Sequence, residues 1–167
     1  MLVWKVLDVK KCMNAMLASE AFDFLLLSDA QITTKIHYEI DGHLTPGYLM
    51  EEERRMESIP EEGCIPYGHL RGVCFDVIKG KRKPASFRFT FLCPRSGIRQ
   101  IIAQGQLAVR PEDVANLTLN VKYANEELYI TAGCTLHTFT MDRAMENAWD
   151  AWVAGFLKRL EIAVETV

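Results

Sequence analysis

The chain has 167 residues and a formal net charge of -3 at pH 7; 49% of its residues are hydrophobic, 25% charged and 10% aromatic. This composition is that of an ordinary globular protein, and it excludes a disordered, collagen-like or coiled-coil chain. The sequence contains no run of about 18 apolar residues, so it predicts no membrane span and no membrane partner. Five scattered cysteines without a CxxC pair, and an N-terminal apolar run too short for a signal peptide, indicate reduced thiols in a cytoplasmic protein. A chain of this length is expected to form one domain, residues 1–167.

The first part of the chain predicts short strands and an amphipathic helix. Residues 2–7 favour a strand, and Asp8 is a suitable N-cap for a helix whose apolar residues recur at helical spacing. Residues 24–27 are an apolar run that predicts a buried segment. Residues 30–40 alternate strictly between apolar and polar side chains, which predicts one long strand ended by Asp41-Gly42. One face of that strand should be packed and the other exposed.

The middle of the chain breaks this pattern. Residues 43–66 are rich in proline, glycine and acidic residues, and they predict a long acidic loop with a short exposed helix near 50–57. A second amphipathic helix is expected from Pro66, with Gly80 ending it. Its predicted apolar stripe consists of Leu70, Val73, Cys74, Val77 and Ile78.

The last part predicts a series of strands and a terminal helix. Residues 87–92 alternate as a strand, residues 98–103 fit either a strand or a helix, and residues 117–131 predict a hairpin. A further strand is expected after Gly133, through Leu136 and Thr140. The helix 142–162 carries Trp149 and Trp152 on its apolar stripe, which predicts that both are core residues. The order of elements predicts an α+β fold: a mainly antiparallel sheet packed by two or three amphipathic helices.

Motifs for catalysis and for cofactor binding are missing from the sequence. It has no phosphate-binding glycine loop, no GxSxG and no HExxH, so neither a cofactor nor a metal is predicted. Two pairs of residues stay open as enzyme sites: Cys134 with His137, and His37 with Glu39. Strand geometry places Cys134 and His137 on opposite faces, and an exposed strand histidine is the simpler interpretation of His37.

Charge is distributed unevenly along the chain. Residues 41–62 carry seven acidic residues against two arginines, a balance of -5, whereas residues 71–110 carry nine basic residues against Asp76, a balance of +8. Clustered cations attract phosphate groups, although cations near a helix C-terminus are also favoured by the helix dipole. The predicted contact surface consists of Lys79, Lys81, Arg82, Lys83 and Arg88. The acidic loop 51–62 is a candidate to compete for this surface from within the chain.

Three segments carry a resemblance to a known family. The start of the first helix at Val9-Lys10, the run 72–84, and residues 136–142 before the Trp149 helix resemble an uncharacterised family of small proteins from clostridial gut bacteria. The resemblance covers nearly the whole chain; it implies a bacterial cytoplasmic protein and brings no activity with it. The order of elements is also similar to one domain of the sliding-clamp proteins that tether DNA polymerases, although no sequence motif accompanies that similarity.

The sequence therefore favours a non-enzymatic α+β binding protein that uses its basic residues to contact nucleic acid or an acidic protein. An enzyme of unrecognised type, based on Cys134 and His137 or on His37 and Glu39, is the first alternative. The second is a structural scaffold that forms homo-oligomers through a sheet edge or an apolar helix face.

Overall fold

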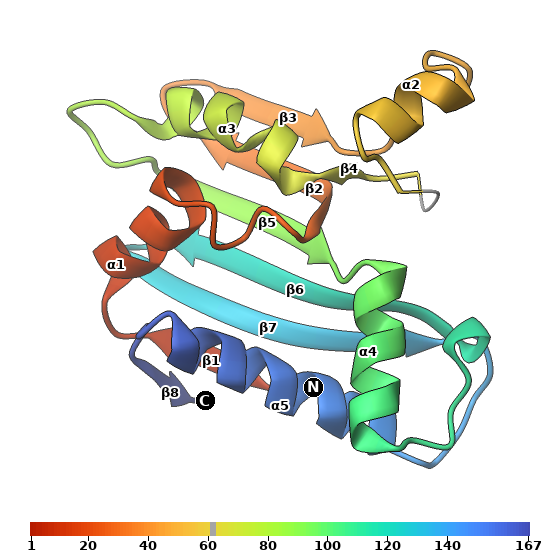
Figure 1. Ribbon diagram of the computed structural model, residues 1–167. Helices are drawn as coiled ribbons and strands as arrows, with labels where there is room; N and C mark the ends of the chain where they lie inside the picture. The colour runs from red at the N-terminus through yellow and green to blue at the C-terminus, as the bar shows by residue number, and fades with distance from the viewer. Residues whose placement is uncertain (61–62) are drawn as a thin grey trace.

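The computed structural model describes residues 1–60 and 63–167. Within these residues one antiparallel sheet has the strand order β3-β2-β5-β6-β7-β1-β8, and the short β4 also pairs with β2 (Figure 1). The predicted α+β fold is confirmed. The strands are β1 Val3–Val6, β2 Leu26–Thr33, β3 His37–Asp41, β4 Ile65–Pro66, β5 Ser86–Leu92, β6 Val114–Ala124, β7 Glu127–Leu136 and β8 Val164–Thr166.

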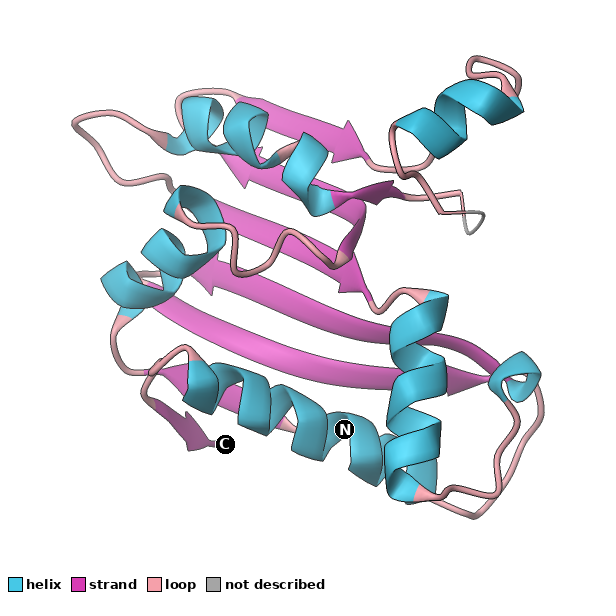
Figure 2. Ribbon diagram, in the orientation of Figure 1, coloured by secondary structure: helices cyan, strands magenta, loops and turns pink. Residues whose placement is uncertain are grey.

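Helices cover one face of this sheet. Figure 2 shows α1, α3, α4 and α5 on the same side of the strands, while α2 stands beyond the end of β3. In the described part of the chain, none of the helices has the length and apolar character needed to cross a membrane. The helices are α1 Val9–Met13, continued by the π-helical turn η1 Asn14–Ala18, α2 Glu51–Met56, α3 Arg71–Ile78 after the 3-10 turn η2 Tyr67–His69, α4 Arg95–Gly105, the 3-10 turn η3 Pro111–Asp113, and α5 Ala144–Arg159.

The core lies between the sheet and its helices, as the alternating pattern predicts. On β5, Phe87, Phe89 and Phe91 are buried toward the helices, while Arg88 points to the other face and is exposed. Trp149 of α5 is fully buried, and its indole Nε1 donates a hydrogen bond to the Thr118 carbonyl oxygen at 2.9 Å. Each large apolar side chain buried in this way contributes about 1.5–3 kcal/mol to stability. In the part of the chain that the structure describes, the other face of the sheet carries no helix (Figures 1 and 2), and on β6 it presents Thr118, Asn120 and Lys122.

The alternating segment 30–40 is a hairpin, and the prediction of one continuous strand is wrong. β2 ends at Thr33, and β3 begins at His37 and runs back beside it, with Ala30 opposite Ile40. Three residues form the turn, so the paired residues Thr33 and His37 differ by an even number and the alternation continues through it. Periodicity alone therefore could not reveal this turn.

Gly42 follows the hairpin at a point where the backbone is crowded. Its N–H donates to the Ser28 carbonyl oxygen at 3.0 Å, and a Cβ at this position would overlap the carbonyl oxygen of Leu27. Only glycine fits here without displacing the strand. The chain then leaves the sheet and returns to it at β4.

The strand predicted after Gly133 is not separate. β7 runs without a break from Glu127 to Leu136, and Gly133 lies inside it opposite Thr118. A Cβ on Gly133 would overlap the Thr118 side chain, so this glycine marks a close cross-strand approach rather than the start of a strand. The predicted hairpin 117–131 is confirmed within the longer pair β6 and β7.

The ambiguous segment 98–103 is helical, and the terminal helix is shorter than predicted. Three isoleucines of α4 face the core at helical spacing. α5 begins at Ala144, whose N–H donates to the Asp142 carboxylate at 2.9 Å, and it ends at Arg159. The remaining residues turn back to form β8 beside β1, a strand that the sequence pattern did not predict.

Two residues expected in the core are exposed. Phe24, from the predicted buried run 24–27, is 46% exposed, and Val73, from the predicted stripe of α3, is 51% exposed. Cys74 and Ile78 hold α3 against the core instead. α3 is short, and its second and third residues, Gly72 and Val73, are both exposed, so its buried face is narrower than the predicted stripe.

Candidate functional site

Residues 79–85, which we call the basic loop, connect α3 to β5 at one end of the sheet (Figure 1). Lys79 pairs with Asp76 of α3, with 3.0 Å between Nζ and Oδ1. Lys81, Arg82 and Lys83 are exposed, and no carboxylate of the described residues pairs with them. Three cations of this loop are therefore open to an anionic partner.

Arg88 lies on the uncovered face of the sheet, two residues inside β5. The strand register places it directly opposite Lys122 of β6, and both side chains are exposed. Arg88 approaches Asp29 at 3.6 Å, whereas Lys122 has no ion-pair partner in the described part of the chain. Like charges directly opposite each other on neighbouring strands are destabilising. Folding thus places two cations side by side, where they repel each other.

Other cations reach the same end of the sheet from distant parts of the sequence. Lys35 occupies the turn between β2 and β3. This turn lies next to the basic loop because Thr33, at its start, pairs with Ser86, and the Thr33 carbonyl oxygen accepts a hydrogen bond from the Ala85 N–H. Lys10 of α1 and Lys83 line one hollow of about 840 Å³. We call this group the basic end; it consists of Lys10, Lys35, Lys79, Lys81, Arg82, Lys83, Arg88 and Lys122.

The basic end is larger than the sequence predicted. Lys35 and Lys122 were missed because each is isolated in the sequence and comes near the loop only through strand pairing. Lys10 was missed because it lies on α1, far from the loop in the sequence, and meets Lys83 only at the hollow that both line. Acidic residues also lie nearby: Asp8 and Glu126 line the hollow with Lys83, and Asp76 pairs with Lys79. The exposed cations still outnumber these carboxylates.

The acidic segment does not cover the basic end, so its predicted competition for that surface is wrong for the described residues. α2 stands at the opposite end of the sheet from the loop that joins α3 to β5 (Figure 1). Glu61 and Glu62, which belong to the predicted loop, lie outside the described residues. The predicted helix near 50–57 is confirmed as α2.

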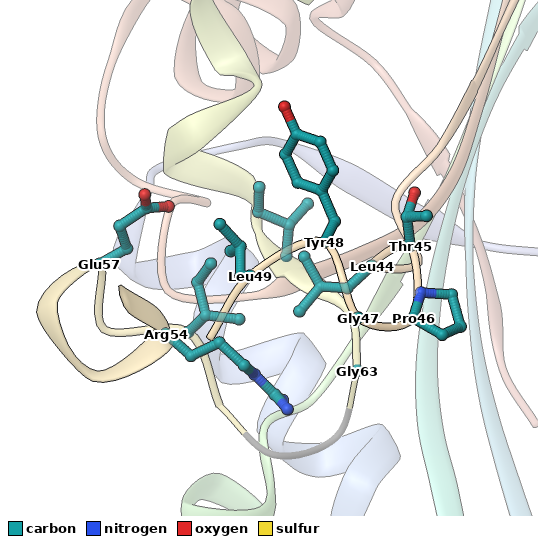
Figure 3. Close-up of a pocket in the computed structure, with 11 residues that line it drawn as sticks. Leu44, Thr45, Pro46, Gly47, Tyr48, Leu49, Arg54, Glu57 and Gly63 are labelled. Carbon is teal, nitrogen blue, oxygen red and sulfur yellow. The ribbon is translucent and has the colours of Figure 1, made fainter. Parts of the chain in front are cut away.

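The segment forms a pocket of its own instead. His43 and Cys64 form an antiparallel β-bridge, and the Leu44 N–H donates to the Gly63 carbonyl oxygen at 2.7 Å. These contacts hold the two ends of the segment together. Inside it is a pocket of about 420 Å³ with largely aliphatic walls, and Figure 3 shows Tyr48 and Arg54 at its rim. Tyr48 is 81% exposed.

Cys134 and His137 do not form a catalytic pair in this structure. Cys134 is half-buried on the helix side of β7, and burial, reinforced by the negative charge of Asp150, raises the pKa of its thiol. His137 is exposed beyond the end of the strand, where its backbone N–H donates to the Asp113 carbonyl oxygen. Both line one shallow hollow, but no hydrogen bond joins them within the described residues. A raised pKa lowers the thiolate fraction that nucleophilic catalysis needs.

His37 and Glu39 do meet on the exposed face of β3. His37 Nε2 lies 3.3 Å from Glu39 Oε1, and its Nδ1 lies 2.8 Å from the Thr33 hydroxyl. His43 similarly contacts Asp41, and hydrogen bonds from His43 hold the pKa of that carboxyl below its usual range. Among the residues that the structure describes, no three potential ligands gather in a geometry that could hold a metal ion. These pairs are surface contacts in an open, water-exposed setting.

Comparison with known proteins identifies a family but no activity. The model of a family of unknown function, DUF5721, matches residues 15–165. No curated protein and no solved structure matches the chain. The expectation of an uncharacterised family is thus confirmed.

Proposed function

The chain belongs to DUF5721, a family of unknown function, and we propose that it is a non-enzymatic protein that binds nucleic acid through its basic end. The cross-strand pair of Arg88 and Lys122 is the observation that carries the proposal. A sheet position that served only stability would favour a neutral or oppositely charged pair. A phosphate group between the two side chains would convert their repulsion into attraction.

The surroundings of this pair suit a nucleic acid better than a compact anion. The exposed cations of the loop precede β5, and the pair lies further along the same strand, so the cations are distributed over the end of the sheet and not gathered in one pocket. Beyond the pair, farther from the loop, the uncovered face offers hydroxyl and amide groups, including Thr90, whose hydroxyl donates to the Asn120 side-chain oxygen at 3.0 Å. Extended cationic tracks bind nucleic acid through its phosphates with little sequence preference.

We further propose that the protein is bacterial and cytoplasmic. The scattered cysteines and the resemblance to a clostridial family support this location and origin. The similarity in element order to a sliding-clamp domain points to the same kind of partner, but the proposal rests on the basic end alone. An acidic protein partner and a homo-oligomeric scaffold are the alternatives that the test must separate.

The test is fluorescence anisotropy of labelled single- and double-stranded DNA at about 50 mM salt, repeated as the salt concentration is raised. Lys122→Glu should weaken binding and lower the slope of affinity against salt by about one, because one phosphate contact is lost. The triple change Lys81→Glu, Arg82→Glu and Lys83→Glu should abolish binding. Arg99→Glu is the matched control, since Arg99 is exposed on α4 without an ion-pair partner in the described residues.

Each outcome separates the alternatives. Absence of DNA binding at the lowest salt would reject the proposal. Binding to polyglutamate in place of DNA would instead favour an acidic protein as the partner. An equal effect of Arg99→Glu would show attraction by the whole molecule and not by the basic end. A scaffold would show a solution mass above 19.0 kDa that is unaffected by these changes.

A further inference from the structure

A hollow between α4 and α5 takes no part in the proposed function. It has a volume of about 450 Å³ and lies on the helix side of the sheet, where Phe24, Ile101 and Trp152 supply apolar walls. Gln100 and Gln104 of α4 add amide groups to its lining. This volume is within the range of small-molecule sites, which combine apolar walls with a few polar groups.

The aromatic side chains of the apolar wall pack against one another, and one of them is partly uncovered. Phe24 is 46% exposed, although its ring packs edge-on against Trp152 and Phe156 with centroids 5.9 and 5.7 Å away. Trp152 stacks in turn on Trp149 and on Phe156, at 5.1 and 5.2 Å. Aromatic side chains held in this way lose little freedom when a ligand packs on them.

One cation stands at the edge of this wall. The guanidinium carbon of Arg159 lies 5.8 Å from the Trp152 ring centroid, so part of this exposed side chain lies over the aromatic wall. Gly155, one turn earlier, leaves room for it: a Cβ there would lie 3.4 Å from Arg159 Nη1. No carboxylate of the described residues pairs with Arg159, which leaves its N–H groups available for a bidentate contact.

We propose that this hollow binds a small aromatic carboxylate, with the ring against Phe24 and Trp152 and the carboxylate on Arg159. A flat apolar group would pack against the uncovered aromatic surface, and a planar anion would accept hydrogen bonds from the Arg159 guanidinium. The two amides of α4 can bind a further polar substituent. This site is separate from the basic end, so either proposal can fail without the other.

The probe is 2-naphthoate, with the neutral 2-naphthylmethanol as its comparison, titrated into the intact protein and followed by calorimetry and by NMR of the tryptophan indole N–H groups. The Trp152 indole signal, identified with the Trp152→Phe variant, should shift on addition of naphthoate. The Trp149 signal should shift much less, because Trp149 is fully buried and does not line the hollow. Naphthoate should bind more tightly than the alcohol.

Variants of two neighbouring cations decide the role of Arg159. Arg159→Gln should weaken naphthoate about tenfold and change the affinity for the alcohol by less than about twofold, since it removes one charged hydrogen-bonding group. Lys158→Gln removes the same charge from the same turn without touching the hollow, and it should leave both affinities unchanged. Equal affinities for the two probes, equal effects of the two variants, or a Trp152 signal that does not move would each overturn the proposal.

Discussion

The chemistry of Cys134 decides whether the enzyme alternative that uses Cys134 and His137 survives. Burial and the nearby Asp150 raise the pKa of its thiol, so alkylation by iodoacetamide should show a pH midpoint above the ordinary cysteine value of about 8.5. Asp150→Asn removes a negative charge that disfavours the thiolate, so it should move the midpoint down. Mass spectrometry of the Cys134 peptide across a pH series measures both.

His137→Ala is the matching control for this titration. Because no hydrogen bond joins His137 to the thiol in the described residues, the midpoint should not change in that variant. A midpoint below the ordinary cysteine value that rises in His137→Ala would instead indicate a histidine-assisted thiolate. That result would restore Cys134 and His137 as a catalytic pair.

At the scale of elements, Tyr67 connects the turn before α3 to the π-helical end of the first helix. Its hydroxyl donates to the Met16 carbonyl oxygen at 3.0 Å in a fully buried site, and burial raises the pKa of Tyr67 so that it remains a donor. Tyr67→Phe keeps the ring, which packs edge-on against Phe91 at 4.9 Å, but leaves the carbonyl without this donor. The free energy of unfolding should fall by about 1–2 kcal/mol in urea denaturation.

A second tyrosine supplies the control for that loss. Tyr48 is 81% exposed at the rim of the pocket near α2, so Tyr48→Phe should change the free energy of unfolding by less than about 0.5 kcal/mol. If the two variants behave alike, the Met16 carbonyl has another partner. The connection between the two helical segments would then depend on packing alone.

The elements themselves were predictable where one local pattern specified them. Asp8 caps the first helix as predicted, with its carboxylate accepting the Lys11 N–H, and the alternation of β5 correctly identified its buried phenylalanines. The hairpin at residues 34–36 was not predictable from periodicity, because pairing Thr33 with His37 preserves the alternation. Gly133 was misread for a different reason: the crowding that requires it comes from Thr118, on another strand.

At the scale of the whole molecule, the hydrophobic core and most of the residues of the proposed binding surface lie on different parts of the sheet. Its helix-covered face holds the core, while the uncovered face and the adjacent end of the sheet gather cations from β5, β6, α1 and two loops. The basic residues that follow one another in the sequence, such as Lys81 and Arg82, could be predicted as one cluster. Lys122 could not, because its place opposite Arg88 depends on the register between strands that lie more than thirty residues apart.

The basic end also predicts a conflict between stability and binding, which a double-mutant cycle on Arg88 and Lys122 measures. Threonine is the replacement at each position, since it fits an exposed strand without charge. If the two cations repel each other, the cycle should give an unfavourable coupling of about 0.5 kcal/mol at low salt. The coupling should shrink at about 1 M salt, where screening acts within about 3 Å.

The same variants then report on the partner. Lys122→Thr should bind DNA more weakly than the natural chain while it unfolds at the same or a higher urea concentration. This combination is typical of a residue kept for binding at some cost in stability. Asp29, 3.6 Å from Arg88, could instead neutralise the pair within the protein itself. In that case the coupling would be zero or favourable at every salt concentration, and the main argument for an anion at this place on the sheet would be lost.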